Sequence, residues 1–402
     1  MHRVVITGLG IATPVGASAE ECWDSICNLR SGINRIGRFD AERFPVSCAG
    51  TIAPFSGENE VKKRLTPQTD RITRVALACA SSTFADADLE AAKFDPFDIG
   101  VSISSSTGGL EFGQEQLGQL WREGWETVSP YMSFAWYYAV NTGQVSIANN
   151  LQGPSCVPIS EQAGGLDSLS YSARQIIKGT PVMLAGAIDG IICPYGVAIL
   201  GSARGVNRSG DPKSYRPFSG RSSGFFPGEG GALMVLESEE TVRSSAYAVL
   251  SGHASAFDPE PSTGHGLRQA ATEALRRARI EPGDVDLVFA DAYGEKSLDD
   301  AEATVISDLF GRSGVPVTAP KTMTGRLMSG GASLDAALAC LSLRNQIIPP
   351  TLFDGSSGDL HESLDIVTDS RSAHLKNVMV LARGHGGFAS AAVLSRPNET
   401  AK

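Results

Sequence analysis

The sequence predicts an α/β fold made of two duplicated halves, each with a mixed sheet covered by helices. Three observations support this prediction: a globular composition, an internal match between distant segments, and strand-like segments that alternate with helix-like ones. Hydrophobic residues make up 42% and charged residues 19% of the 402 residues. This balance is typical of chains that bury a core, and the length corresponds to two or three domains of about 150 residues.

The internal match joins two ten-residue segments without a gap. Residues 95–104 (DPFDIGVSIS) align with residues 281–290 (EPGDVDLVFA). Each segment is predicted to turn at the acidic residue and the proline and then to form a buried strand. A helical pattern precedes each of them, at residues 72–78 and 267–278. Alternation of strands and helices favours mixed sheets sandwiched by helices.

The elements that follow each matched segment also keep their order. The predicted counterparts are strands at 156–160 and 315–320, helices that open at Gly164 and Gly330, and strands at 181–185 and 377–381. We therefore place an N-terminal half at residues 1–245 and a C-terminal half at residues 246–402. Any α/β protein has some self-similarity, which is the alternative explanation of these matches.

Two stretches have no counterpart in the other half. Residues 110–150 are rich in aromatic residues, which form either a core or an interface, and interfaces favour Trp and Tyr. We expect an interface there. Its central residues are Phe134, Trp136, Tyr137 and Tyr138. Residues 201–231 are rich in Gly, Ser, Arg and Pro and are predicted to form a long ordered loop.

Several function classes are excluded by composition. The 34 basic and 44 acidic residues give a net charge of −10, which does not suit non-specific nucleic-acid binding. No apolar run approaches the roughly 18 residues of a membrane span, and a strand-like run at residues 4–8 leaves no room for a signal peptide. The seven cysteines are scattered, so we expect reduced thiols in the cytoplasm. No metal or nucleotide motif is present.

Residues 159–165 (ISEQAGG) have the pattern of a nucleophile elbow, a turn that leads into a helix. A Cys at the turn would be activated as a thiolate by the helix N-terminus. Here the turn residue is Gln162, which is not a nucleophile, and Cys156 is expected to be a buried core thiol. None of the six histidines sits next to the helix at Gly330 or the strand ending near Ala292, where the duplication would place partners for Gln162, so no Cys–His pair can form at this turn. The histidines are His2, His253, His265, His361, His374 and His385.

Five motifs make the sequence resemble the ketosynthases of the thiolase-fold superfamily. The motifs are residues 8–16 (GLGIATPVG), 216–218 (RPF), 224–231 (GFFPGEGG), 321–325 (KTMTG) and 384–388 (GHGGF). They span nearly the whole chain in the order that the family has. The resemblance implies a thiolase-like fold, in which mixed five-stranded sheets are layered between helices (αβαβα).

The sequence departs from this family at its catalytic positions. Gln162 stands at the catalytic Cys position, Tyr293 at the first catalytic His position and Arg326 at the second. These changes rule out condensation by this chain, which would still be a subunit of a β-ketoacyl synthase (acyltransferase) complex. Gln followed by AGGLD is similar to one subgroup, the chain length factors, or ketosynthase beta subunits, of type II polyketide synthases.

Membership of this subgroup implies an obligate heterodimer with a catalytic ketosynthase alpha subunit in antibiotic biosynthesis. It also implies substrates carried on the phosphopantetheine of a separate acyl carrier protein, with no cofactor or metal in this chain. The beta subunit would shape the tunnel at the subunit interface that sets polyketide chain length. Two alternatives remain: an autonomous malonyl-carrier decarboxylase that uses Gln162, and a ketosynthase-like acyltransferase that uses Cys156.

Each catalytic position also has a structural interpretation. The Gln162 amide could assist malonyl-carrier decarboxylation by donating N–H bonds to a thioester carbonyl or enolate, or it could satisfy backbone groups at the turn. Arg326 could bind a carboxylate or a phosphopantetheine oxygen, but an ion pair with Glu161 or an Asp is favoured. Tyr293 is expected to pack with its hydroxyl satisfied.

By its resemblance to the family, the tunnel is expected to be lined by Leu110, Gly113, Leu117 and Tyr195. The first three share one side of a predicted helix. Family members often carry bulky aromatics at the two Leu positions, so Leu and Gly suggest a tunnel at least as long as the common one. The alternative is that neighbouring side chains fill the space.

Overall fold

The computed structural model describes residues 3–53, 61, 63–240, 242, 245–355 and 360–397. One large sheet runs through the molecule in the strand order β12-β10-β9-β14-β15-β8-β1-β7-β6-β4-β5. In the N-terminal half its strands are β1 (Val4–Ala12), β4 (Ile99–Ser104), β5 (Ser155–Cys156), β6 (Val182–Asp189) and β7 (Gly230–Ser238). In the C-terminal half they are β8 (Ala248–Phe257), β9 (Leu287–Phe289), β10 (Pro316–Thr318), β12 (Asp365–Ile366), β14 (Asn377–Arg383) and β15 (Phe388–Ser395).

The two halves repeat one topology, as the sequence match predicted. In each half the strand of the matched segment, β4 or β9, pairs in parallel with two neighbours, β5 and β6 or β10 and β14. The sheet then continues with antiparallel pairs. In the N-terminal half β6 pairs with β7 and β7 with β1, and in the C-terminal half β14 pairs with β15 and β15 with β8. The expected five-stranded sheets are therefore present. They differ from the prediction in two ways: β1 and β8 join them edge to edge, and the short β12 extends one of them.

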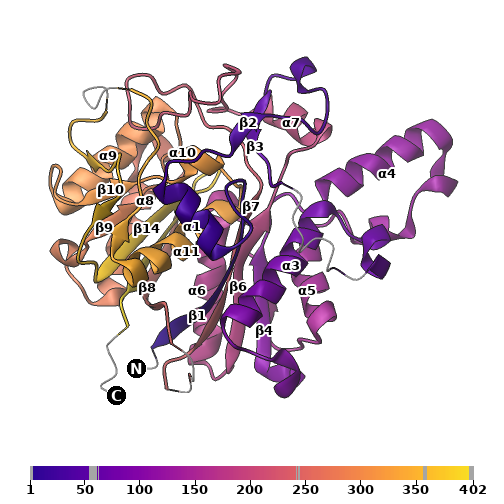
Figure 1. The fold of residues 1–402 in the computed structure, drawn as a ribbon, viewed down its shortest axis with the longest axis horizontal. Helices are drawn as coiled ribbons and strands as arrows, with labels where there is room; N and C mark the ends of the chain where they lie inside the picture. Colours follow the sequence, from indigo (N-terminus) through magenta and orange to yellow (C-terminus); the bar gives the residue numbers. More distant parts are fainter. Residues whose placement is uncertain are drawn as a thin grey trace.

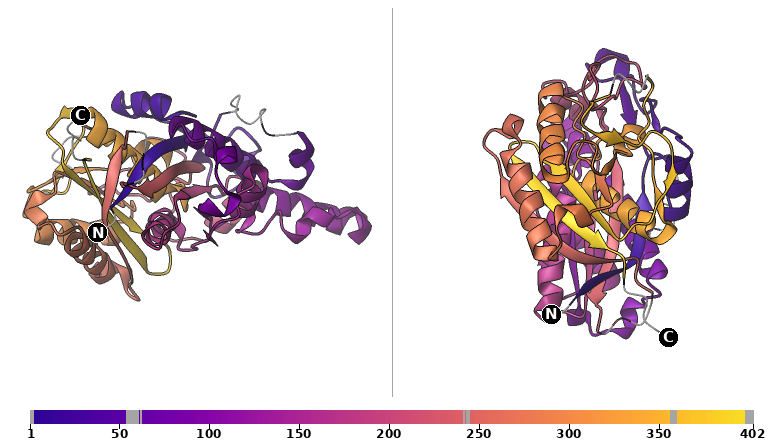
Figure 2. Two further views of the ribbon diagram at one scale, coloured as in Figure 1. Left: turned by 90° about the horizontal axis from the view of Figure 1, so that it is seen from below. Right: turned by 90° about the vertical axis from the view of Figure 1, so that its left-hand side faces the viewer.

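The helices form layers on both sides of these sheets (Figure 1 and Figure 2). Their bounds are α1 (Ala19–Cys27), α3 (Arg71–Asp86), α4 (Leu110–Glu123), α5 (Val140–Asn149), α6 (Gly164–Ile177), α7 (Pro194–Leu200), α8 (His265–Ala278), α9 (Lys296–Phe310), α10 (Lys321–Thr324) and α11 (Gly330–Asn345). Two small antiparallel ladders lie outside this sheet: β2 (Ile33–Arg35) pairs with β3 (Cys48–Gly50), and β11 (Ile347–Ile348) pairs with β13 (Arg371–Ser372). Among the described residues, no helix is both long and apolar enough to cross a bilayer.

The central layer is formed by α6 and α11, which pack between the two halves of the sheet. On α6, four buried apolar residues recur at helical spacing: Leu166, Leu169, Ala173 and Ile176. They share one core with apolar side chains of α11 and of strands from both halves, including β6 and β14. Every residue of β1 is buried, because the strand is covered on both faces. Two outer cores, under α3 and α8, close the layers.

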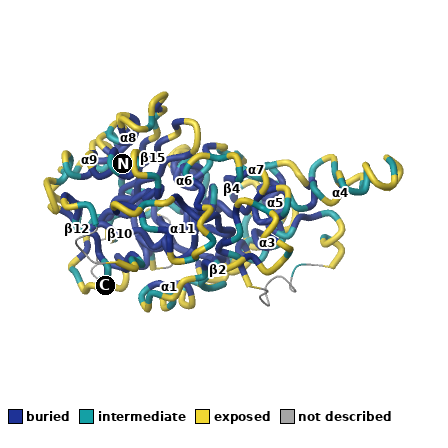
Figure 3. The backbone as a smooth tube through the Cα atoms, turned by 90° about the horizontal axis from the view of Figure 1, so that it is seen from above, coloured by how far each residue is buried: buried dark blue, intermediate teal, exposed yellow. Residues whose placement is uncertain are grey.

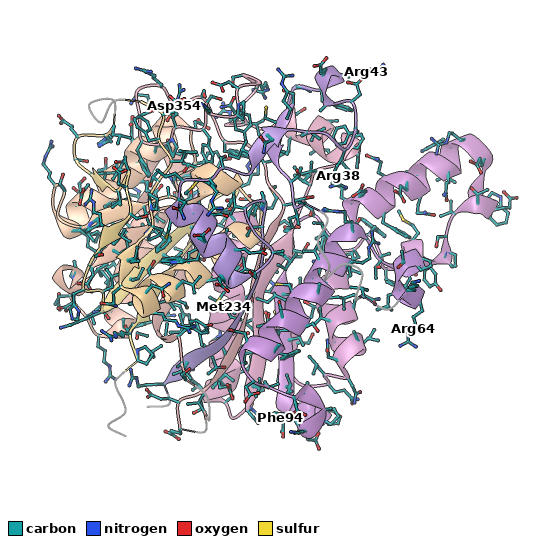
Figure 4. All side chains as sticks on the ribbon, in the orientation of Figure 1. Arg38, Arg43, Arg64, Phe94, Met234 and Asp354 are labelled. Carbon is teal, nitrogen blue, oxygen red and sulfur yellow. The ribbon has the colours of Figure 1, made fainter. Side chains whose placement is uncertain are left out.

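The stretch between β4 and α5 is an arm that projects from the layered body. Figure 1 shows α4 extending away from the sheets, and Figure 3 shows that much of this helix is exposed. Arg38, labelled in Figure 4, lies at the base of the arm and bridges Glu111 of α4 to Glu229, at 2.5 Å and 3.1 Å. The predicted loop at residues 201–231 has neither helix nor strand before β7 begins at Gly230.

Candidate functional site

The turn that carries Gln162 lies where β5 leads into α6. A 3₁₀ turn over Glu161–Ala163 precedes the helix, and Glu161 has a φ of 48°, in the left-handed region that costs free energy for a non-glycine residue. The Gln162 side chain is fully buried, and neither of its amide atoms has a hydrogen-bond partner among the described residues. The structure therefore contradicts the interpretation that this amide satisfies backbone groups at the turn.

Two glycine pairs let the N-termini of α6 and α11 approach this amide. A Cβ on Gly331 would collide with all three terminal atoms of the Gln162 side chain, and a Cβ on Gly165 would lie 2.6 Å from the backbone nitrogen of Ser333. The Gln162 amide is therefore confined between the first turns of two long helices. Helix N-termini favour negative charge or a carbonyl oxygen at such a place.

Cys156 does not occupy the place that the sequence predicted. It lies on β5, the outermost strand of the sheet, and is half-buried there. The prediction of a buried core thiol is therefore wrong, because β5 has a neighbour on one edge only. The turn position itself offers no nucleophile in place of the missing cysteine.

Arg326 is the largest fully buried side chain of the described residues, and its partners are acidic and aromatic. Its guanidinium lies 3.2 Å from the Asp291 carboxylate and donates to the backbone carbonyls of Asp291 and Arg383, at 3.1 Å and 3.0 Å. It also stacks 4.4 Å from the centroid of the Tyr293 ring. Of the interpretations considered for Arg326, the structure shows the ion pair with an Asp.

A second arginine joins this buried network. Arg383, the last residue of β14, lies 3.1 Å from Asp291 and 2.8 Å from Glu302. Burial alone would raise the pKa of Asp291, but Arg326, Arg383 and Lys321 together lower it below its usual value. Glu302 accepts hydrogen bonds from the backbone nitrogens of Asp291 and Ala292, at 2.7 Å and 3.0 Å. These contacts fix the loop that carries the first catalytic His position.

Tyr293 packs as the sequence predicted. Its ring meets that of Phe225 edge to face, with centroids 5.3 Å apart, and burial raises the pKa of its hydroxyl to about 12. The hydroxyl makes no hydrogen bond to any described residue. Together, Tyr293 and Arg326 close the space where a pair of catalytic histidines would act.

The backbone of one histidine, His385, contacts the turn. The backbone nitrogen of His385 donates to the Glu161 carboxylate at 2.9 Å, and His385 itself is exposed. His385 belongs to neither the helix at Gly330 nor the strand ending near Ala292, and it reaches the turn because the loop between β14 and β15 folds back over residues 160–161. The space beside it is tight, since a Cβ on Gly384 would collide with the Ser160 carbonyl. Burial raises the pKa of Glu161.

The four expected tunnel residues lie on two neighbouring helices. Leu110, Gly113 and Leu117 are on α4, and Tyr195 is in the first turn of α7. The Tyr195 backbone nitrogen donates to the side-chain oxygen of Gln114 at 2.6 Å, which joins the two helices. Leu117 and Tyr195 are 40% and 47% exposed in the single chain, so their side chains are available to line a wall.

Leu110 and Gly113 are less open than the sequence suggested. Leu110 packs against the apolar cluster that includes Ile192 and Val197. A Cβ on Gly113 would lie 3.3 Å from the Cβ of Trp136, tighter than ordinary van der Waals contact. A neighbouring residue therefore occupies the space beside Gly113, which is the alternative considered above, and Leu117 is the most exposed of the three expected α4 residues.

The expected interface residues divide into exposed and half-buried ones. Trp136 and Tyr137 are 46% and 45% exposed, whereas Phe134 and Tyr138 are half-buried. Three more side chains in the same stretch are highly exposed: Trp121 (83%) and Trp125 (75%), which belong to its aromatic residues, and Ile147 (74%), which sequence reasoning did not single out. Large apolar side chains at such exposure mark an interaction surface. The sequence signal for Trp121 is its spacing, since it follows Leu117 by one turn of α4.

The sequence matches the models of two halves of one family. The N-terminal domain of β-ketoacyl synthases matches residues 1–241, and their C-terminal domain matches residues 243–353. The structure is similar to the solved structure of the ishigamide ketosynthase/chain length factor. The TM-score is 0.91 and the sequence identity 24%, over 99% of this chain and 100% of that one. It is equally similar to a β-ketoacyl synthase from Burkholderia phymatum, with a TM-score of 0.91 and 23% identity, over 99% and 100% of the two chains. These likenesses establish the fold.

Two relatives from Streptomyces are more similar in sequence. The tetracenomycin polyketide synthase ketoacyl synthase beta subunit of Streptomyces glaucescens is 44% identical over 402 residues, which cover 98% of each chain. A β-ketoacyl synthase 2 for the polyketide actinorhodin, from Streptomyces coelicolor, is also 44% identical with the same coverage. The chain therefore belongs to the β-ketoacyl synthase family and, within it, to the ketosynthase beta subunits, or chain length factors, of polyketide synthases.

Proposed function

We propose that this chain is the non-condensing chain length factor of a type II polyketide ketosynthase, paired with a catalytic alpha subunit. One observation carries the proposal: Gln162 stands at the nucleophile position, while Arg326, paired with Asp291, fills the second histidine position. Condensation needs an activated nucleophile and a base beside it. Neither is present at this turn, so the condensing residues must lie on another chain.

The exposed side chains of residues 110–150 support an obligate partner. Trp136 and Tyr137 are nearly half exposed, and aromatic residues at such positions are typical of interfaces. The 44% identical relative is itself named a beta subunit. The alpha subunit would condense units delivered by an acyl carrier protein, whose phosphopantetheine carries the growing chain. This chain would need no cofactor, nucleic acid or membrane of its own.

The role in chain length is supported by α4 and α7. The side chains of Leu117 and Tyr195 are exposed on joined helices, and α4 meets the expected interface residue Trp136 at Gly113, so a tunnel along the interface would pass them. A larger side chain at position 117 would shorten the space available to the polyketide. The wall residues would thus limit elongation without taking part in the chemistry.

The test is reconstitution with a catalytic alpha subunit, the carrier protein and a malonyl donor. Leu117→Phe should shift products to shorter chains, as measured by mass spectrometry, while total turnover falls less than the distribution changes. Glu115→Phe is the matched control, because position 115 lies about 160° around the helix from position 117 and should leave the lengths unchanged. Condensation by the isolated chain would contradict the proposal.

A second candidate function is assistance in priming, and the orphaned amide of Gln162 favours it. A buried amide with no partner on either atom requires a ligand or water to satisfy it. A malonyl thioester could supply that ligand, with the amide N–H stabilising the enolate formed on loss of CO₂. Gln162 is fully buried in this structure, so substrate reaches it only when neighbouring residues move.

Gln162→Ala tests this second role. In the heterodimer it should slow priming from malonyl-carrier by about 10²–10³, the usual cost of one oxyanion donor, and leave elongation of a supplied acyl primer nearly intact. Equal priming by variant and parent would contradict the role. Decarboxylation by the isolated chain would instead favour an autonomous malonyl-carrier decarboxylase. Iodoacetamide labelling of Cys156 would test an acyltransferase that uses this thiol.

We also propose a cytoplasmic location. All seven cysteines are unpaired thiols in the structure, which suits a reducing compartment. A non-reducing gel of protein taken directly from the producing cells would test this, because a disulfide-linked chain would contradict it.

A further inference from the structure

Asp189, the last residue of β6, is a fully buried carboxylate that collects hydrogen-bond donors from three segments. It accepts from four backbone nitrogens, those of Ser106 (2.7 Å), Thr107 (3.3 Å), Gly190 (3.1 Å) and Ser329 (3.2 Å). The hydroxyls of Ser105, at 3.1 Å, and of Thr107 also donate to it. A carboxylate held by this many donors is fixed in place, since each bond to a charged group is stronger than a neutral one.

The donors belong to the elements that frame the proposed tunnel. Ser105 to Thr107 form the turn that leads through Gly108 and Gly109 into α4, where Leu117 lies. Ser329 directly precedes α11 and stands two residues before Gly331, against which the Gln162 amide is confined. A second link supports the first, because the hydroxyls of Ser106 and Ser329 lie 2.6 Å apart. Asp189 therefore joins the turn before α4 to the start of α11, whose Gly331 confines the Gln162 amide.

The other tunnel helix leaves from the same point. The chain runs from Asp189 through Gly190 to α7, which begins at Pro194 and carries Tyr195. The Thr107 hydroxyl, which donates to Asp189, also lies 2.9 Å from the Gly190 carbonyl, so the turn before α4 contacts this segment as well. Asp70 also holds α4, by accepting from the Phe112 nitrogen at 2.8 Å, but its second bond goes to α3 and not to the elbow.

We propose that Asp189 is a positioning residue that sets tunnel depth by fixing the start of α4 relative to the elbow. The proposal rests on the proposed function of α4 as the tunnel wall. Depth depends on how far Leu117 lies from the elbow, and Asp189 is the described carboxylate that contacts both the turn before α4 and the start of α11. If Asp189 no longer holds the start of α4, Leu117 takes several positions, and elongation then stops at several chain lengths.

The test is Asp189→Asn in the reconstituted heterodimer. The amide keeps the size of the carboxylate but turns one acceptor into a donor that faces N–H groups. Products other than the parent's main length should rise by roughly threefold or more, the scale of one weakened hydrogen bond. Ser106→Ala, which removes only the hydroxyl link to Ser329, should change the distribution in the same direction but less. Heterodimer content, by size-exclusion chromatography, and the melting temperature are measured in parallel.

Asp258→Asn is the matched control. Asp258 is a buried carboxylate that accepts from the backbone nitrogens of Glu260 and Gly266, and neither of these belongs to α4, α11 or the elbow. It should leave product lengths unchanged. The proposal would be overturned if Asp189→Asn gave the same distribution of product lengths as the parent while Leu117→Phe still shortened the products. The proposed function would then still stand.

Two further outcomes complete the test. If Leu117→Phe also leaves the lengths unchanged, α4 is not the wall, and the proposed function fails together with this proposal. If Asp189→Asn does not assemble with the alpha subunit, Ser106→Ala decides, and a parent distribution in that variant would overturn the proposal.

Discussion

The Arg326 guanidinium lies 3.2 Å from the Asp291 carboxylate, and both side chains are closed to solvent. A buried charge is tolerated only when it is paired and hydrogen-bonded. Arg326 can therefore stand at a catalytic histidine position only because Asp291 faces it. The site is filled by an ion pair, which explains how a chain without condensing residues keeps a close-packed fold.

Breaking that pair should destabilise the protein strongly. Arg326→Ala removes one partner and leaves Asp291 with Arg383 alone, a change that typically costs about 3–5 kcal/mol for a buried pair. The melting temperature of the purified heterodimer should fall accordingly. Arg371→Ala is the control, because its ion pair with Asp365 is at the surface and should matter little. Equal melting temperatures for Arg326→Ala and the parent would show that the buried pair is unimportant.

Gly331→Ala should reproduce the effect of Gln162→Ala on priming. The added methyl group collides with the Gln162 amide and forces it to move. Because both variants act on one side chain, the double variant should be no worse than Gln162→Ala alone. Priming rates from malonyl-carrier are the measurement. Gly283→Ala is the control, since a Cβ there meets nothing within 4 Å. Additive losses would indicate that position 331 acts independently of Gln162.

The isolated chain should self-associate, because Trp136 and Tyr137 expose an apolar surface that the partner would cover. In the heterodimer, Trp136→Ala or Tyr137→Ala should weaken association by about 2 kcal/mol, the threshold of an interface hot spot, or roughly 30-fold in Kd. Analytical ultracentrifugation measures both effects. Phe97→Ala, an exposed aromatic outside residues 110–150, should leave Kd unchanged. A monodisperse monomer in isolation would count against the partner requirement.

His253 should make the protein lose stability in mild acid. Burial, together with the charges of Arg174 and Arg277, lowers its pKa from 6.5 to about 4. A histidine with a lowered pKa contributes stability that is present above pH 6.5 and is lost as the pH falls toward 4, because the unfolded chain takes up the proton first. The melting temperature of His253→Gln should therefore fall less between pH 7 and pH 4.5 than that of the parent. Parallel curves would show that another group controls this range.

Much of the fold could be predicted from local pattern. The matched segments 95–104 and 281–290 became β4 and β9 in equivalent places of the two halves, and the glycine pairs at 164 and 330 opened α6 and α11 as expected. Hydrophobic periodicity and turn residues act over a few residues, so a sequence displays them directly. The edge-to-edge junction of β1 with β8 could not be read this way, because strand pairing is a long-range choice.

The functional site also combines features that the sequence determines with features that only long-range packing determines. The sequence by itself determined that Gln162, Tyr293 and Arg326 replace a catalytic set, since residue identity alone decides whether a nucleophile is present. Only the tertiary structure decided what those residues do there. The orphaned Gln162 amide, the pairing of Arg326 with Asp291, the return of His385 to the turn and the donors gathered by Asp189 all join segments distant in the chain. Such contacts arise from packing in three dimensions, which no local pattern of residues encodes.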